Sequence, residues 1–398
     1  MAVVNDIQSV DDFNEVVKKI KEMDDFPGPM YYGFGVGTFQ DGKLLSAWFP
    51  VVNGPEDNTG MAALAWYISD HPEDPSVMAE SEITEMQRDL LPFKDDGKDH
   101  PNIDALRLAR ECSGETTELG LKLRPVRVIL TDLNTPPTDA ADVYFRLHLL
   151  SHRKVKPHGV NLDGMFGMLQ NVAWTDQGPV LASEIDRVRL KTQRQVHVRL
   201  IDKIPHMADF VVPSGVRIAN TAQVRLGAYL GEGTTVMPAG FVNFNAGTLG
   251  EAMIEGRISA GVTIDNGTDV GGGVSTLGTL SGGNDVVIST GKDCLLEANS
   301  GLGIPIGDRV RVEAGLYVKG TTPISVSRWS WKGNDLVTAV IDGTTPAGRT
   351  LDHVVVKAEK LAGISDAIFR RNAKTGTVEV IPRGNSIWGE LNADLHAN

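Results

Sequence analysis

The sequence has little cysteine, lacks long apolar runs and shows no excess of basic residues. Cys112 and Cys294 are the two cysteines among 398 residues, so we predict no disulfide framework and place the chain in the reducing cytoplasm. No run approaches the eighteen or more apolar residues of a membrane span. The first residues contain no basic segment followed by an apolar one, so no secretory signal peptide is predicted.

The charge is negative and unevenly distributed. The formal net charge is −13 at pH 7. The first 120 residues contain 24 Asp and Glu against 9 Lys and Arg, which leaves the rest of the chain nearly neutral. Such an acidic N-terminal part argues against nucleic acid as a partner. The C-terminal part, with its arginines, is better suited to anionic small molecules.

The N-terminal half alternates helical and strand patterns. Ser9 is placed to cap a helix that follows it, and residues 31–52 predict a β-hairpin that turns at Asp41-Gly42. Further patterns predict helices at 81–93, 102–112 and 140–153, with a strand at 126–132. We therefore predict a mixed α/β N-terminal domain over residues 1–205.

An aliphatic residue then recurs at every sixth position, a period that fits neither a helix nor a single strand. The first run is Val212, Ile218, Val224, Leu230, Val236 and Val242. Short strands joined by tight turns give this period when they wrap into a coil of three sides, with about 18 residues per coil. Of the 43 glycines, 22 lie within residues 212–320, as a turn in every hexad requires. The pattern predicts a left-handed parallel β-helix over residues 206–320.

A second run of the same period follows the first. It comprises Ile288, Cys294, Ser300, Ile306, Val312 and Val318, and it shares its phase with Ile258, Ile264 and Val270. The first run is out of phase with it by four residues, which predicts one interruption within residues 245–256. A loop at 276–285 is expected to bulge from the coil. Breaks in a repeat mark loops, where functional residues tend to lie.

The period stops after residue 320. Hairpins are predicted over residues 327–343 and 367–383, the second turning at Thr375-Gly376. We expect residues 321–398 to form a small C-terminal β cap over the open end of the coil.

After His206, its first residue, the predicted coil contains no histidine, since none occurs between His206 and His353. This excludes a histidine base and a histidine zinc site inside the coil. Ten carboxylates lie within residues 212–320, most at hexad positions that face solvent. Glu255 lies at the phase break, where a partly desolvated carboxylate can serve as a general base. Glu251 is the second candidate.

Two other features are weaker signals. His148 and His152 share a helical face but lack the intervening Glu of a zinc-protease motif, so a structural role is favoured. The glycine-rich residues 271–283 predict a loop whose bare backbone lets a ligand approach, with the N–H of Gly278 as a candidate oxyanion donor.

Several motifs between about residues 145 and 373 are long enough to be specific: "LHLLSHRKVKPHGVNLDGMF", "NVAWTDQG", "VPSGVRIA", "GEGTTVMPAGFVNFNAGT", "MIEGRISAG", "GGGVSTLGTLSGG", "VEAGLYV" and "FRRN". Together they resemble the tetrahydrodipicolinate N-succinyltransferase family of hexapeptide-repeat acyltransferases. The resemblance implies a homotrimer that transfers succinyl from succinyl-CoA to the amine of tetrahydrodipicolinate, in lysine and diaminopimelate biosynthesis. Residues 1–140 resemble the family only loosely.

The resemblance also implies the roles of particular residues. The Glu of "MIEGR" is the family's catalytic carboxylate and falls on Glu255, either as general base or as the site of a transient acyl anhydride. The residues implied to contact succinyl-CoA are Arg257, Gly272, Ser275, Ala298, Glu313, Ala314, Lys357, Arg370, Arg371, Asn372 and Ala373. The family usually has Ser where Ala373 stands, so one hydroxyl contact is expected to be absent.

Some family members hold a divalent cation on the trimer axis. The matching positions are Ala222 and Ala239, which cannot act as ligands, so we predict no metal and no tightly bound cofactor. Two alternatives stay open. Another acyl-CoA N- or O-acyltransferase on the same scaffold predicts a histidine in the coil, and a non-catalytic β-helix binding module predicts coils without a phase break.

Overall fold

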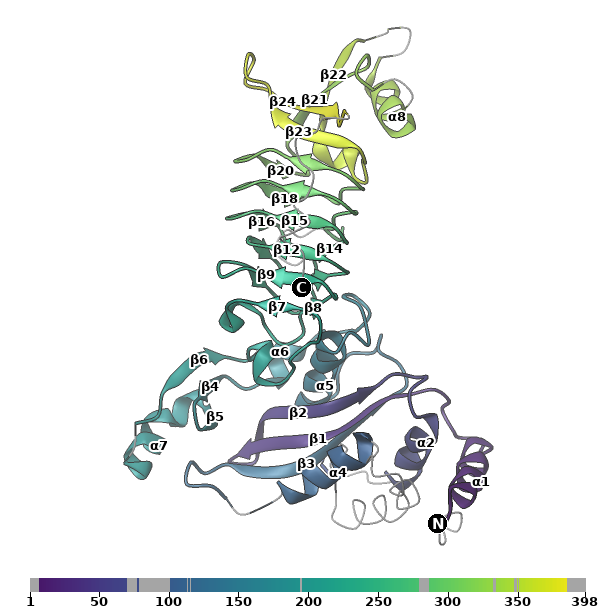
Figure 1. Cartoon of the computed structure of the whole chain (residues 1–398), viewed down its shortest axis with the longest axis vertical. Coiled ribbons are helices and arrows are strands. Elements are labelled where there is room, and N and C mark those ends of the chain that lie inside the picture. Colours follow the sequence, from purple (N-terminus) through teal and green to yellow (C-terminus); the bar gives the residue numbers. More distant parts are fainter. Residues whose placement is uncertain are drawn as a thin grey trace. The chain divides into compact units, whose positions relative to one another are not determined.

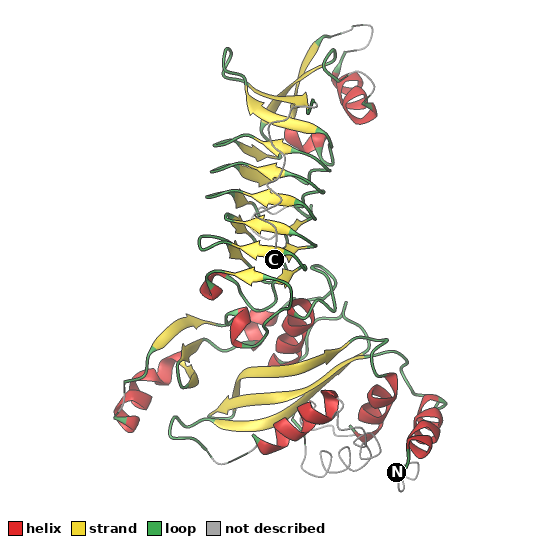
Figure 2. Cartoon of the chain, in the orientation of Figure 1, coloured by secondary structure: helices red, strands yellow, loops and turns green. Residues whose placement is uncertain are grey.

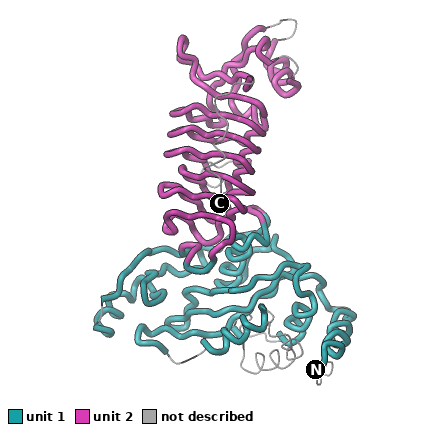
Figure 3. The backbone as a smooth tube through the Cα atoms, viewed as in Figure 1, with its two compact units in different colours: residues 1–155, 159–205, 209–211 teal, residues 156–158, 206–208, 212–398 magenta. Residues whose placement is uncertain are grey.

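The computed structural model describes residues 7–69, 77–78, 101–112, 114, 116–193, 195–278, 286–331, 334–346, 349 and 351–384. The chain divides into two compact units, coloured separately in Figure 3. Unit 1 comprises Met1–Val155, Gly159–Pro205 and Asp209–Val211, and unit 2 comprises Lys156–His158, His206–Ala208 and Val212–Asn398. The helix predicted at 81–93 lies outside the described residues.

Unit 1 is a mixed α/β region, as predicted. Its described helices are α1 (Val10–Lys21), α2 (Thr59–Ile68), α4 (Pro101–Glu111), α5 (Ala140–Ser151), α6 (Met165–Met168) and α7 (Ile185–Thr192). Its described strands are β1 (Tyr31–Gln40), β2 (Lys43–Asn53), β3 (Lys122–Leu130), β4 (Val172–Thr175), β5 (Gly178–Leu181) and β6 (Val198–Asp202). They form two antiparallel sheets, in the orders β2-β1-β3 and β5-β4-β6 (Figure 2).

Local sequence signals explain the first elements of unit 1. Ser9 caps α1: its Oγ accepts a hydrogen bond from Asp12 N at 3.1 Å, and the Asp12 carboxylate accepts from Ser9 N at 2.9 Å. The β1–β2 hairpin turns at Asp41 (φ 49°) and Gly42 (φ 77°), the left-handed pair that suits a two-residue hairpin turn. Both predictions are confirmed.

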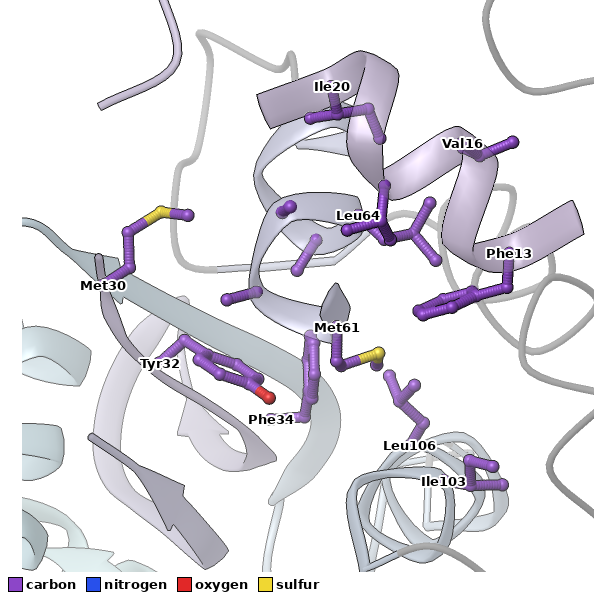
Figure 4. Packing of buried hydrophobic residues seen from close by; sticks show 14 of the residues in the cluster. Phe13, Val16, Ile20, Met30, Tyr32, Phe34, Met61, Leu64, Ile103 and Leu106 are labelled. Carbon is purple, nitrogen blue, oxygen red and sulfur yellow. The ribbon is translucent and has the colours of Figure 1, made fainter. Parts of the chain in front are cut away.

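The hydrophobic core of unit 1 joins three helices to one face of the larger sheet. Figure 4 shows Phe13 and Ile20 of α1, Leu64 of α2 and Leu106 of α4 gathered near Phe34 of β1. Each of these side chains is at most 6% exposed. Removal of this much apolar surface from water is the main favourable term that holds unit 1 together.

Unit 2 is built on a parallel β-helix, as the hexads predicted. Its coil strands are β7 (Arg217–Ile218), β8 (Tyr229–Leu230), β9 (Thr234–Val236), β10 (Phe241–Val242), β11 (Gly247–Thr248), β12 (Ala252–Ile254), β13 (Arg257–Ile258), β14 (Thr263–Ile264), β15 (Thr268–Val270), β16 (Ser275–Thr276), β17 (Leu295–Leu296), β18 (Gly301–Gly303), β19 (Arg311–Val312) and β20 (Tyr317–Lys319). They pair in parallel as three sheets, one per side: β10-β13-β16-β18-β20, β14-β11-β8, and the run β19-β17-β15-β12-β9-β7 (Figure 1).

Four positions of the first run lie inside the coil and Ile218 is partly exposed, whereas in the second run Leu296 and not Cys294 is in register with Val270. Val224, Leu230, Val236 and Val242 are fully buried. Val212 is 85% exposed, so its assignment to the interior is wrong. It lies before β7, where the regular strand pairing begins, and therefore has no rung of the coil to pack on.

The coil contains two shortened sides, whereas one interruption was predicted. The first runs from Ile254 to Ile258, which is four residues instead of six. Phe241 therefore pairs with Arg257, sixteen positions later, instead of with a residue eighteen positions later as in a regular coil. The second runs from Leu302 to Ile306 and makes Gly301 pair with Tyr317, again sixteen positions later. Glu255 therefore lies at a shortened side, but this is not a unique place in the coil.

The C-terminal strands extend the coil. They are β21 (Pro323–Ser327), β22 (His353–Lys357), β23 (Ala367–Arg371) and β24 (Val378–Pro382). β23 pairs in parallel with β19, and β23 and β24 form the hairpin predicted over residues 367–383, which turns through Gly376 (φ 71°). This small β cap confirms the last part of the predicted fold class.

The hairpin predicted over residues 327–343 is wrong, because helix α8 (Asp335–Thr344) occupies most of that range. Asn334 caps the helix by accepting a hydrogen bond from Val337 N at 3.0 Å. Val337 and Ile341, four residues apart, are the buried positions of one helical face. No helix among the described residues is long and apolar enough to cross a membrane.

Candidate active site

One corner of the coil carries most of the residues singled out in the sequence. Ile254, Val270, Leu296, Val312 and Phe369 pair in register from β12 to β23, and their side chains are buried one above another inside the coil. The residues that follow the first four turn one corner of the prism: Glu255, Gly271, Gly272, Glu297, Ala298, Glu313 and Ala314. Arg370 and Arg371 follow Phe369 as the last residues of β23, and we call the whole set the β12 corner. Neighbouring strands lie about 4.8 Å apart, so four steps separate Glu255 from Arg370 by about 19 Å.

Glu255 is held at the start of this corner by its backbone. The N–H groups of Glu255 and Gly256 both donate to the carbonyl of Val270, at 2.8 and 3.1 Å. Its carboxyl group lies over Gly272, where an added Cβ would stand 3.3 to 3.5 Å from the carboxyl atoms. Glycine at 272 therefore leaves room for the carboxylate and for a ligand beside it. The carboxylate is exposed in the single chain, so the desolvation expected of it is not supplied by its own coil.

Arg257 is fixed by a side chain from the next coil. Its Nε and Nη2 donate to Oγ of Ser275, at 3.1 and 2.9 Å, and Ser275 is 5% exposed. Arg257 forms no ion pair with the residues that the structure describes. Two of its five N–H donors are occupied in this way, and three are left for an anionic ligand. The structure thus brings together four of the predicted residues: Glu255, Arg257, Gly272 and Ser275.

At the other end of the β12 corner the predicted cations already have partners. Arg370 donates to Glu379 at 2.8 Å, and Asn372 Nδ2 donates to the second oxygen of the same carboxylate at 3.1 Å. These contacts lower the pKa of Glu379, against the opposing effect of burial. Arg371 is anchored by its backbone N–H to Glu313 at 2.7 Å and by Nη1 to Gly376 O at 2.8 Å.

The other residues predicted to contact the substrates lie at several different places in unit 2. Ala298 and Ala314 lie at the β12 corner, and Ala314 N donates to Glu297 at 3.1 Å. Ala373 is exposed in the turn after β23. Lys357 ends β22, which is separated from β23 by β24 and β21, so about 14 Å lie between the two strands. Of the predicted glycine-rich loop at 271–283, residues 271–278 are described and include β16, and Gly278 is the last of them; residues 279–285 lie outside the described residues.

The contacts of His148 in α5 support a structural role for this residue, and His152 caps the C-terminal end of the helix. His148 is fully buried, its Nδ1 lies 2.7 Å from Tyr144 O, and its Nε2 accepts from Phe49 N at 3.4 Å. Burial lowers the pKa of His148 to about 3. Among the described residues, no group of three or more His, Cys, Asp or Glu side chains is placed to hold a metal ion.

Comparison with known proteins decides the family. A model of the N-terminal part of tetrahydrodipicolinate N-succinyltransferases matches residues 11–167, a model of their middle part matches 169–206, and a model of their hexapeptide repeat matches 287–319. The 2,3,4,5-tetrahydropyridine-2,6-dicarboxylate N-succinyltransferase of Vibrio cholerae is 40% identical over 375 residues, which cover 92% of this chain and 99% of that protein. The chain belongs to the tetrahydrodipicolinate N-succinyltransferase family.

Other members of the family agree with this assignment. The enzyme of the same name from Pseudomonas paraeruginosa is 50% identical over 278 residues, which cover 69% of this chain and 75% of that protein. A crystal structure of a putative 2,3,4,5-tetrahydropyridine-2-carboxylate N-succinyltransferase from Campylobacter jejuni aligns with a TM-score of 0.80 and 30% identity, over 95% of this chain and 98% of that one. The N-terminal match shows that the likeness reaches well into residues 1–140, where the motifs alone gave little.

Sequence reasoning missed the partners of the site residues. The Arg370–Glu379 pair could have been predicted from the sequence, because a hairpin centred beside Thr375 places these two residues opposite each other. The Arg257–Ser275 contact had a signal as well, since the two residues are eighteen positions apart, one full coil.

Proposed function

We propose that the protein is a 2,3,4,5-tetrahydropyridine-2,6-dicarboxylate N-succinyltransferase acting in the cytoplasm, with succinyl-CoA as donor and no tightly bound cofactor. The observation that carries the proposal is the 40% identity over 99% of the Vibrio cholerae enzyme. The geometry of the β12 corner supports it. The carboxylate of Glu255, the unpaired N–H donors of Arg257 and the backbone of Gly272 lie at one end of the β12 corner.

The reaction requires proton transfer, binding of a substrate carboxylate and room for the pantetheine arm of CoA. Water opens the imine ring of tetrahydrodipicolinate to give a free amine, the amine attacks the thioester carbon, the C–S bond breaks, and CoA leaves as a thiolate. Glu255 takes the proton from the attacking nitrogen and passes it to the leaving sulfur, so the carboxylate is regenerated. Arg257 binds a carboxylate of the acceptor or of the succinyl group. The β12 corner spans about 19 Å from Glu255 to Arg370, which accommodates the extended pantetheine arm of CoA.

Within this proposal the chain has three parts. Residues 206–320 form the acyltransferase β-helix, residues 1–205 the N-terminal α/β domain, and residues 321–398 the capping segment that carries the phosphate-binding arginines. The direct test is release of free CoA from succinyl-CoA in the presence of tetrahydrodipicolinate. A donor panel that includes acetyl-CoA tests the rival acyltransferase, and no thiol release with any donor would favour the binding module and overturn the proposal.

The first prediction concerns assembly. We expect a homotrimer, because the exposed Glu255 carboxylate gains the desolvation that a general base needs when a second coil faces the β12 corner. Light scattering at micromolar concentration should give three times the chain mass of 42.9 kDa. A mass equal to one chain would contradict this prediction.

The second prediction concerns the CoA end. Replacing Arg370 and Arg371 together with Ala should raise KM for succinyl-CoA about ten-fold or more, with little change in KM for the acceptor, because charge-assisted contacts to phosphate are lost. Of the single variants, Arg371→Ala should have the larger effect, since Arg370 is neutralised by Glu379 at 2.8 Å. Steady-state kinetics with each substrate varied in turn measures both effects.

Arg309→Ala is the matched control. Arg309 is also exposed and paired with a carboxylate, Asp366 at 2.6 Å, but it precedes β19 and so lies away from the β12 corner. It should leave both KM values unchanged. An equal rise in both KM values for the double variant would place the phosphates elsewhere.

A further inference from the structure

One side of the coil, built from β13, β16, β18 and β20, carries a row of residues in register (Figure 1). Arg257 pairs with Ser275, Ser275 with Gly301, and Gly301 with Tyr317. The residue after each of them is buried inside the coil, so the members of the row face away from the interior. Three strand steps separate Arg257 from Tyr317, about 14 Å. The proposed succinyl transfer gives Tyr317 no role.

The ring of Tyr317 lies over the bare backbone of Gly301. A Cβ added at Gly301 would overlap Cδ1 of the ring and stand 2.5 Å from Cε1 and 2.8 Å from Cγ. Near-equal closeness to three successive ring atoms holds for a point over the face of the ring and not for one beyond its edge. One face of the Tyr317 ring therefore rests on β18, and glycine at 301 makes room for it.

The rest of this ring is open to solvent. Tyr317 is 44% exposed, although its ring is held against the coil. An aromatic ring with one face on backbone and the other face open offers a flat π surface that is already in place. Such a surface suits a planar ligand that stacks on it.

A cation shares the outward face of β20 with this ring. Lys319 is two residues from Tyr317 and therefore projects to the same side of the strand. Its side chain is exposed and forms no ion pair with the residues that the structure describes. A planar group with an attached anion matches the ring and the ammonium group together.

The row reaches the region where the proposed function places the phosphates of CoA. Arg371 N donates to Glu313 at 2.7 Å, and Glu313 precedes Tyr317 by four residues. Four residues span at most about 14 Å even when fully extended, and here they turn a corner. CoA carries its adenine base one ribose beyond the phosphates. With the phosphates at Arg371, the base therefore comes within reach of β20.

We propose that Tyr317 is the platform on which the adenine base of CoA stacks, with Lys319 binding a phosphate group of the same nucleotide. This inference rests on the proposed use of succinyl-CoA. Tyr317 then determines specificity, because it favours a donor that carries the nucleotide over a shorter thioester with the same pantetheine arm.

Binding of the nucleotide alone tests the platform without catalysis. We expect the full-length protein to bind adenosine 3′,5′-bisphosphate with saturation below about 10 mM by calorimetry. Tyr317→Leu should weaken this binding about ten-fold, because the stacking surface is lost. Tyr317→Phe should stay within about two-fold of the wild type, since the ring is kept. Gly301→Ala should weaken binding as Tyr317→Leu does, because its methyl group takes the place of the ring.

Two donors separate the base from the pantetheine arm. With succinyl-CoA, Tyr317→Leu should lower kcat/KM about ten-fold, mainly through KM. With succinyl-pantetheine, which lacks the nucleotide, the variant and the wild type should agree within about two-fold. If the wild type releases thiol from neither donor, the proposed function is wrong, and the calorimetry still decides the role of Tyr317.

Trp329→Leu is the matched control. Trp329 is also an exposed aromatic residue of unit 2, but it follows the end of β21 and its Nε1 donates to Asp352 at 3.0 Å. It should bind the nucleotide as the wild type does. The proposal is wrong if Tyr317→Leu binds as tightly as this control, or if its kcat/KM falls equally with both donors. A changed mass of Tyr317→Leu by light scattering would assign the ring to an interface between copies of the chain instead.

Discussion

Glu255→Gln is expected to lower kcat by about 10² to 10⁴ while the protein still folds and binds succinyl-CoA. The amide has the shape of the carboxylate but cannot take the proton from the attacking amine. The backbone contacts of Glu255 and Gly256 to Val270 do not involve the side chain, so the coil should be unaffected. Thiol release under saturating substrates measures kcat, and calorimetry measures binding of the donor.

Glu251→Gln is the matched control for this variant. Glu251 lies four residues earlier in the same coil, and its backbone N–H donates to Asn266 at 2.9 Å. We expect the control to keep kcat within about two-fold of the wild type, because its carboxylate lies before β12 and not at the corner after it. Near wild-type turnover by Glu255→Gln, with donor binding intact, would remove the central residue of the mechanism.

A second measurement separates the two roles of Glu255. A general base leaves the enzyme unmodified when succinyl-CoA is present without acceptor. An acyl anhydride would leave a succinyl group on Glu255, which rapid quenching and mass spectrometry detect as a mass increase on that residue. The substitution tests whether Glu255 takes part in the reaction. The rapid-quench measurement distinguishes a general base from an acyl anhydride.

The coil was predictable because its constraint is local and repeated. An inward aliphatic residue and a corner residue recur in every hexad, so the sequence alone indicated the fold and placed Glu255 at a short side. Hairpins with strong turn signals, such as Asp41-Gly42, were predictable for the same reason.

The second short side could not be detected from the hexad phase, because an insertion before it and the short side together leave the phase unchanged. Between the inward residues Thr276 and Thr290 the chain is eight residues longer than a hexad, and between Leu302 and Ile306 it is two residues shorter. The two changes together add six residues, one whole hexad, so the phase after Ile306 matches the phase before the insertion. Cys294 therefore looked like an inward anchor, whereas Leu296, two positions later, is the residue in register with Val270.

The partners of the site residues could be predicted only with strand register in hand. That Arg370 is neutralised by Glu379 and that Ser275 fixes Arg257 follow from which residues stand opposite each other, not from residue type. Unit 1 was harder to predict from the sequence. The family motifs begin only near residue 145, within α5, and a pocket in unit 1 is lined by two sheets whose residues are far apart in sequence.

The largest effect on stability is expected at Arg146 of α5, whose side chain is 1% exposed. Its Nε donates to Asp142 at 2.7 Å, and Nη1 donates to the carbonyl groups of Leu133, Thr135 and Asn161 at 2.7 to 3.0 Å. Arg146→Ala would leave a buried carboxylate without its cation and would remove the Arg146 donor from the carbonyl groups of Thr135 and Asn161, whereas Leu133 O still accepts from Asn161 N at 2.7 Å. Such a loss costs about 3 to 5 kcal/mol in free energy of unfolding.

Urea unfolding followed by circular dichroism should show this loss as a lower midpoint for unit 1. Lys18→Ala is the control, because Lys18 and Glu22 have the same spacing of four residues but are exposed and 4.0 Å apart, a pair worth about 0.5 kcal/mol or less. Arg146→Lys should fall between the two, since the ammonium group keeps the charge but cannot reach the carboxylate and the carbonyl groups as the planar guanidinium does. Equal midpoints for Arg146→Ala and Lys18→Ala would mean that the buried pair contributes no more than a surface pair, and that α5 is held to its loops by apolar packing alone.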